Sequence, residues 1–152
     1  MKFILALTVA AVFSLTNGQI DDYNSEVLDF VNKIRTASGK KNLCFNTKVA
    51  AAAQVVAKDL AYYQIPQEFT TEVHSVKSVL TANKVQVKGS KEAYGVGIDS
   101  SEAMVNQWNI THRDVLLSDF SFFGAGFVEN KILEFNQYWV IGVVDIMDGA
   151  CE

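Results

Sequence analysis

The chain has 152 residues, with 17 acidic side chains against 13 lysines and arginines, and its formal net charge is −4 at pH 7. This length suits one domain with one hydrophobic core, and the sequence shows no internal repeat, low-complexity stretch or linker between domains. An acidic balance argues against nucleic acid and anionic membranes as electrostatic partners. We therefore expect a single acidic domain that acts as a monomer and has no nucleic-acid partner.

The first 18 residues have the composition of a secretory signal peptide. Lys2 supplies a positive charge, residues 3–15 form an apolar core, and small residues offer a cleavage site before Gln19. The apolar run is too short to span a bilayer, which takes about 20 residues. The sequence thus predicts a secreted, extracellular protein without a stable membrane anchor, with residues 1–18 as signal peptide and residues 19–152 as the domain.

Two cysteines remain in the mature chain, Cys44 and Cys151. An isolated pair in a secreted protein is expected to form a disulfide, because the secretory route is oxidising. The alternative is two free thiols. A zinc site built on this pair is rejected, since the two cysteines lack the close spacing that such sites use.

Hydrophobic periodicity predicts two helices in the first half of the domain. Apolar residues recur at helical spacing over residues 22–38, where Asn24 is placed to cap the start. A second apolar stripe covers residues 49–61, with Asn46 and Thr47 as cap candidates. The many alanines of this stripe permit close approach to other elements.

The pattern is weaker in the middle of the chain. Residues 73–83 predict a helix or a turn-rich segment, and residues 84–98, which contain three glycines, predict irregular structure. A further helix is expected from Asp99, because Glu102 follows this acidic cap candidate at the spacing of a capping box.

Two β segments close the chain, over residues 124–128 and 137–145. Their tyrosine, tryptophan, valine and isoleucine content predicts paired antiparallel strands. Helices first and strands last favour an α+β layer arrangement around one small core.

One of only two histidines, His112, stands beside Arg113 just after the expected helix that contains Trp108. A rare histidine at the boundary of an element suggests metal binding or acid–base chemistry. With other motifs in order along the chain, this stretch resembles the CAP superfamily, the SCP-like domains of cysteine-rich secretory and pathogenesis-related proteins. The matching motifs are Asn32, Arg35, Gly39, residues 43–54, His74, Glu92, Trp108, His112–Arg113, Gly124–Gly126 and Tyr138–Trp139.

The resemblance is to the shorter branch of the family, with its His-Arg pair, and it implies a three-layer α-β-α sandwich with a small antiparallel sheet. It also implies a cavity in which His74 and His112 are ligands of a divalent metal, with Glu92 as a third ligand or as a base that polarises water. Two imidazoles and one carboxylate suit Zn²⁺ or another divalent metal with one open position. The same groups could equally form an acid–base cluster without a metal.

The chain departs from the family pattern near this cavity. Lys91-Glu92-Ala93 replaces the family's Gly-Glu-Asn, so the amide that could orient the carboxylate is missing. Glu102 is a candidate for the fourth cavity residue, although the start of a helix is its better-supported place. Asn109 opens an Asn-Ile-Thr sequon and is a candidate for N-glycosylation beside the cavity mouth.

The sequence contains no nucleophile elbow, His-Glu-x-x-His helix or phosphate-binding loop, and no catalytic residue is assigned. The resemblance favours a secreted protein that binds small lipids or sterols without turnover, in defence or host–microbe interaction. The alternative is a metal-dependent extracellular hydrolase that uses His74, His112 and Glu92 around an activated water. A third hypothesis is a purely structural extracellular domain.

Overall fold

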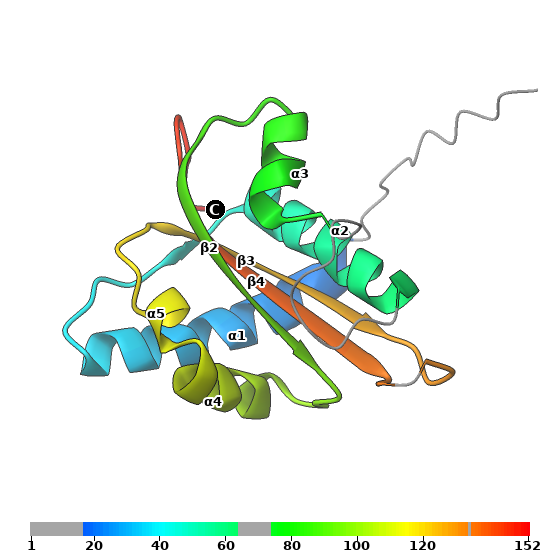
Figure 1. Cartoon of the computed structure of the whole chain (residues 1–152). Helices are drawn as coiled ribbons and strands as arrows, with labels where there is room; N and C mark the ends of the chain where they lie inside the picture. Colours follow the sequence, from blue (N-terminus) through cyan, green and yellow to red (C-terminus); the bar gives the residue numbers. More distant parts are fainter. Residues whose placement is uncertain (1–16, 64–73, 134) are drawn as a thin grey trace, which may run out of the picture.

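The computed structural model describes residues 17–63, 74–133 and 135–152, with the side chains of the first helix described from Asp22 onward (Figure 1). Positions 1–16 of the predicted signal peptide lie outside the described residues. The elements in chain order are α1 (Asn17–Ala37), β1 (Cys44–Phe45), α2 (Thr47–Tyr63), α3 (Val76–Ala82), β2 (Val87–Val96), α4 (Ser101–Thr111), α5 (Arg113–Leu116), β3 (Phe122–Glu129) and β4 (Gln137–Ile146).

Four strands form one mixed sheet in the order β1-β3-β4-β2. Strand β4 runs between β3 and β2 and is antiparallel to both of them. Strand β1 has only two residues and pairs parallel with the start of β3. The predicted antiparallel pairing of the two C-terminal strands is confirmed, and the short parallel edge strand is an addition to it.

Helices cover both faces of this sheet (Figure 1). Side chains alternate between the two faces of a strand, and β4 contributes to two separate buried clusters accordingly. Tyr138 and Val140 pack with residues of α2 and α3. Trp139 and Ile141 pack with residues of α1, α4 and α5. The predicted α+β class and its three-layer α-β-α sandwich are confirmed.

The edge of β3 beyond β1 is closed by two amide side chains. Asn24 of α1 accepts a hydrogen bond from the N–H of Ala125 (2.7 Å) and donates one to its carbonyl (3.2 Å). Gln54 of α2 does the same for Phe127, at 2.8 and 3.0 Å. Each amide supplies the donor and acceptor that a neighbouring strand would supply. The prediction that Asn24 caps a helix is wrong, because Asn24 lies buried within α1.

The start of α2 agrees with the sequence prediction. Asn46 Oδ1 accepts hydrogen bonds from the N–H groups of Lys48 (3.1 Å) and Val49 (3.2 Å). Glu152 adds a further acceptor, since its Oε2 lies 2.6 Å from the N–H nitrogen of Thr47. These bonds satisfy donors that have no partner within the first turn of a helix.

The C-terminal tail is held at this helix start by the predicted disulfide. Cys44 of β1 is bonded to Cys151, 107 positions later, and neither cysteine is free. Asn46 Nδ2 also donates to the carbonyl of Ala150 at 3.0 Å. The disulfide prediction is confirmed, and the alternative of two free thiols is wrong.

Residues 84–98 contain a strand where irregular structure was expected. Strand β2 runs through Gly89 and Gly95 without ending at either of them. A Cβ added to Gly95 would lie 2.2 Å from Sδ of Met104, and one added to Gly89 would lie 2.5 Å from the ring of Phe120. These glycines therefore make room for side chains of other elements rather than interrupt the strand.

Helix α4 begins with a different cap from the one expected. Ser100 is the capping residue, and its hydroxyl accepts a hydrogen bond from the Ala103 N–H at 3.2 Å. The expected box between Asp99 and Glu102 is therefore not formed. Within the described ranges, no helix is both long enough and apolar enough to cross a membrane.

Candidate functional site

Glu92 lies on β2 and shares the face of the sheet that α2 and α3 cover. Its half-buried carboxylate accepts two hydrogen bonds at Oε2, from the N–H of Val76 (3.0 Å) and from the hydroxyl of Tyr94 (2.6 Å). Val76 is the first residue of α3, so the carboxylate is fixed against the start of that helix. The Tyr94 hydroxyl therefore orients a carboxylate that has no flanking amide in its own sequence motif.

His74 lies two residues before α3 and is fixed by a partner on α2. Its Nδ1 is 2.6 Å from Oδ2 of Asp59, and the same oxygen accepts the backbone N–H of His74 at 3.1 Å. The His74 side chain is 62% exposed, whereas that of Asp59 is 22% exposed. The sequence prediction missed Asp59. The feature of the sequence that could have indicated it is an acidic residue within a second helix otherwise rich in alanine and valine.

His112 stands at the junction of α4 and α5, on the other side of the sheet. Its N–H donates to the carbonyl of Trp108 at 2.7 Å, and its Nδ1 lies 2.8 Å from the hydroxyl of Thr111. Two contacts hold this junction against β2, and both are made by residues of β2 that are neighbours of Glu92 in the sequence. Trp108 Nε1 donates to the Tyr94 carbonyl (2.8 Å), and Lys91 pairs with Asp114 (3.0 Å), which lowers the pKa of that carboxyl.

The structure thus places Glu92 on β2 and His74 two residues before α3, both on the face of the sheet that α2 and α3 cover. The Val76 N–H joins Glu92 to the start of α3, just after His74, whereas His112 lies at the junction of α4 and α5 on the opposite face of the sheet. In the part of the chain that the structure describes, no group of three or more histidine, cysteine, aspartate or glutamate side chains is placed to hold a metal ion. A metal site of His74, Glu92 and His112 stays a prediction.

The two other predicted site residues lie on α4. Glu102 is exposed in the first turn of the helix. Asn109 is half-buried, and its Oδ1 accepts a hydrogen bond from the guanidinium of Arg113. Ile110, the middle residue of the sequon, is 84% exposed. Glycosylation of Asn109 stays a prediction.

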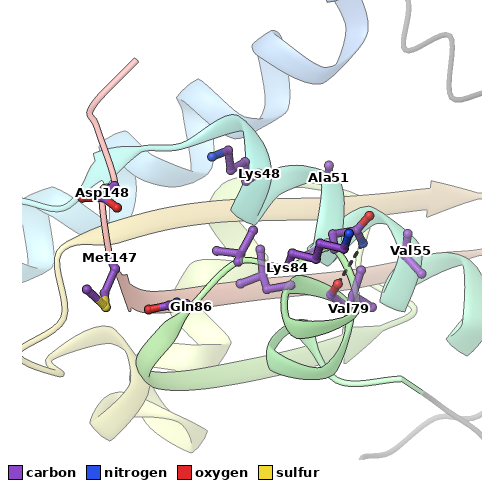
Figure 2. Close-up of a pocket in the computed structure, with 12 residues that line it drawn as sticks. Lys48, Ala51, Val55, Val79, Lys84, Gln86, Met147 and Asp148 are labelled. Carbon is purple, nitrogen blue, oxygen red and sulfur yellow. Dashed lines mark hydrogen bonds between the residues drawn. The ribbon is translucent and has the colours of Figure 1, made fainter.

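A groove of about 650 Å³ between α2 and α3 is the second candidate site, and the sequence prediction missed it. Figure 2 shows α2 along one side and α3 with the following turn along the other, with Met147 and Asp148 at one end and Val55 at the other. The apolar lining comes from Ala51, Ala52, Val55, Val79, Leu80, Val85 and Met147. Exposed Lys48 and Lys84 also line it, so the groove combines an apolar surface with cationic groups.

This fold, with a sheet covered on both faces and clefts beside its helices, defines a class of α+β sandwich domains. The sequence profile described as CAP, the cysteine-rich secretory protein family, matches residues 28–143. The match covers most of the sequence, and the chain therefore belongs to the CAP family. No curated protein matches the chain by sequence.

Solved bacterial structures share the fold. An extracellular SCP-domain protein of Bacillus anthracis strain Ames has a TM-score of 0.65 at 18% identity, covering 86% of this chain and 44% of that one. A cysteine-rich secretory protein of Staphylococcus aureus has a TM-score of 0.61 at 21% identity, covering 84% of this chain and 40% of that one. An outer surface protein of Borrelia burgdorferi has a TM-score of 0.70 at 14% identity, covering 80% of this chain and 91% of that one. The chain thus spans less than half the length of the first two structures.

Proposed function

We propose that this chain is an extracellular protein that binds an anionic single-chain lipid, such as a fatty acid, in the groove between α2 and α3 without turnover. The observation that carries the proposal is an apolar groove of about 650 Å³ with two lysines in its lining. This volume lies within the range of small-molecule sites, about 300 to 1,000 Å³.

The lining of the groove suits each part of such a lipid. Burial of a methylene group is worth about 0.8 kcal/mol, so an alkyl chain gains by lying along Val55, Val79 and Leu80. Among the lining residues that the structure describes, Lys48 and Lys84 outnumber the carboxylate of Asp148. The charge balance favours a carboxylate headgroup over the uncharged hydroxyl of a sterol.

An extracellular location is supported by two observations. The disulfide of Cys44 and Cys151 fits an oxidising compartment. The names of the three similar structures describe extracellular, secretory and outer surface proteins.

Displacement of a fluorescent fatty acid from the groove tests the proposal. Val55→Asp places a charge on the apolar wall, and Lys48→Gln with Lys84→Gln removes the cationic groups. Each change is expected to weaken binding about tenfold, which corresponds to ~1.4 kcal/mol. Lys77→Gln, an exposed position of α3 that does not line the groove, is the control.

The effect of the lysines must depend on the headgroup. The double lysine variant is expected to lose affinity for the fatty acid and keep its affinity for the fatty alcohol of the same length. Unchanged fatty acid binding in Val55→Asp would contradict the groove as the binding site. Equal losses for acid and alcohol in the double lysine variant would contradict the proposed headgroup.

A metal-dependent hydrolase remains the second candidate, and the Asp59–His74 pair favours it. Metal-binding imidazoles commonly have their other nitrogen fixed by a carboxylate, as Asp59 fixes Nδ1 of His74. In this candidate function, His74 and Glu92 would be ligands of a divalent metal that would supply an activated water, and the sequence predicts His112, which lies across the sheet from them, as the third ligand. Zinc titration calorimetry of the wild type, Asp59→Asn and His74→Ala tests this, and equal zinc uptake by all three would contradict it.

A further inference from the structure

A second hollow, of about 660 Å³, lies where α1 and α2 meet beyond the edge of β3. Its lining comes from the first part of α1, the middle of α2, the start of α4 and the adjoining ends of β3 and β4. Gln54, which pairs with the backbone of Phe127, forms part of the lining and ties α2 to this edge. The hollow is therefore built on regular elements and on an amide contact that fixes their spacing.

One side of the hollow is aromatic. The ring centroids of Phe127 and Trp139 are 4.1 Å apart, and the ring of Tyr23 lies 5.9 Å from Phe127 and 6.3 Å from Trp139. Tyr23 donates its hydroxyl hydrogen to Gln54 Oε1 at 3.1 Å, and burial raises the pKa of Tyr23 to about 12. The phenol therefore stays neutral at physiological pH. The three rings form an uncharged wall of fixed geometry.

The rest of the hollow carries negative charge. Among the described residues that line it are four carboxylates, from Asp22 and Glu26 of α1, Asp99 before α4 and Glu129 at the end of β3, and one amine, that of Lys58. Glu26 is held in place by the Ser101 hydroxyl, which donates to its Oε2 at 3.1 Å. This balance of charge is opposite to that of the groove between α2 and α3, and it repels an anionic lipid.

We propose that this hollow binds a small organic ammonium ion, with the cationic nitrogen against the rings of Tyr23 and Phe127 and within reach of the surrounding carboxylates. Aromatic faces attract ammonium groups by about 0.5 to 2 kcal/mol, and quaternary ammonium groups are the ligands that aromatic cages select. A strongly hydrated inorganic cation would rely on the carboxylates, whereas an organic ammonium group also gains from contact with the aromatic rings. A choline group meets both requirements, whether as free choline or as the headgroup of a lipid.

Titration of the oxidised, mature protein with choline tests the inference by calorimetry and by tryptophan fluorescence. Choline is expected to bind at least about tenfold more tightly than its neutral isostere, in which carbon replaces the ammonium nitrogen, a difference of ~1.4 kcal/mol. Magnesium ions are expected not to displace it. Equal affinity for choline and the isostere, or displacement by magnesium at matched ionic strength, would overturn the proposal.

Two variants locate the site. Phe127→Leu removes an aromatic face, and Asp99→Asn removes a carboxylate that lies outside the core; each is expected to weaken choline binding at least about threefold, or ~0.7 kcal/mol. Asp29→Asn, an exposed position of α1 outside the lining, is the control. Wild-type affinity in both variants would overturn the proposal.

The source of the ligand and the independence of the site are tested with the same proteins. Binding to phosphatidylcholine vesicles but not to free choline assigns a lipid headgroup, and binding to free choline assigns a small molecule. No binding to either would overturn the inference. The fatty acid assay is expected to be unchanged in Asp99→Asn, so failure at this hollow is distinguishable from failure at the groove.

Discussion

The two faces of the central sheet differ in how closely the backbones of helix and strand approach each other. On the α2 face, small residues let backbones approach: a Cβ on Gly124 would lie 2.1 Å from the nitrogen of Ala50, and one on Gly126 would lie 2.3 Å from the carbonyl oxygen of Ala53. On the face covered by α1 and α4, large side chains fill the space, and Trp108 is fully buried there.

The difference has consequences for how each face responds to change. Contact between two backbones fixes their distance, because neither partner has a rotamer to change. Contact through long side chains can be relieved by rearranging them, and methionine is the most adaptable of these. Helix α2 is therefore held at one distance from the sheet, and its outward residues Ala51 and Val55 form a groove wall of fixed shape.

The disulfide should be the strongest restraint on the α2 side of the molecule. Replacing Cys44 and Cys151 with serine is expected to lower the free energy of unfolding by about 4 kcal/mol, because the bond restricts a long loop of the unfolded chain. The two cysteines are 107 positions apart, and a loop of this length places the expected stabilisation at the upper end of the range for disulfides. Urea unfolding of the oxidised protein and of the double serine variant measures the loss.

Hydrogen exchange shows where the restraint acts. Amides in the first turn of α2, where Asn46 and Glu152 hold the tail, are expected to exchange faster in the double serine variant. Amides of α4 are expected to keep their protection. Equal acceleration in both helices would mean that the disulfide stabilises the two faces alike.

A pair of matched substitutions separates the two kinds of packing. Gly124→Ala is expected to destabilise the protein by about 3 kcal/mol, because the three atoms nearest to its Cβ would be backbone atoms of Val49 and Ala50. Gly95→Ala should cost only about 1 kcal/mol, since its Cβ would meet the flexible end of Met104, which can move. Thermal unfolding of both variants measures the difference, and equal losses would refute the distinction between rigid and adaptable faces.

Sequence periodicity predicted the helices and strands whose formation depends on residues within the element itself. Helix α2 and strands β3 and β4 follow from apolar spacing within the element itself, and Asn46 caps its own helix. Strand β2 was missed because the space beside Gly95 is taken by Met104, a residue of another element. Asn24 was misassigned because an amide near a helix start suggests a cap, whereas its partner Ala125 lies 101 positions away.

The same distinction applies to the sites. The disulfide was predictable because only two cysteines were available to pair. The partner of His74 was not, since many exposed helices carry an acidic residue like Asp59. The groove depends on where α3 packs against α2, and no local pattern in the sequence encodes that distance.

The smallest difference that we expect between the α2 side and the α5 side of the sheet concerns the loss of folding stability at acidic pH. The ammonium of Lys91 lowers the pKa of Asp114 on the α5 side, and a hydrogen bond from Thr47 lowers the pKa of Glu152 at the α2 start. Each folded-state pKa lies below its unfolded value of about 4. Stabilisation is therefore complete above that pH and is lost as the pH falls through the folded-state pKa.

Both carboxylates are well exposed, so each contributes less than about 1 kcal/mol after screening by solvent. Urea unfolding of Asp114→Asn and Glu152→Gln, at neutral and acidic pH and at low and high NaCl, tests the comparison, with Glu102→Gln as an exposed control. The contribution of Asp114 is expected to fall with salt, because its partner is the mobile ammonium of Lys91. That of Glu152 should persist, since it accepts a backbone N–H held in place by α2. Equal salt dependence of the two carboxylates would show that the α2 start is no more rigid than the α5 surface.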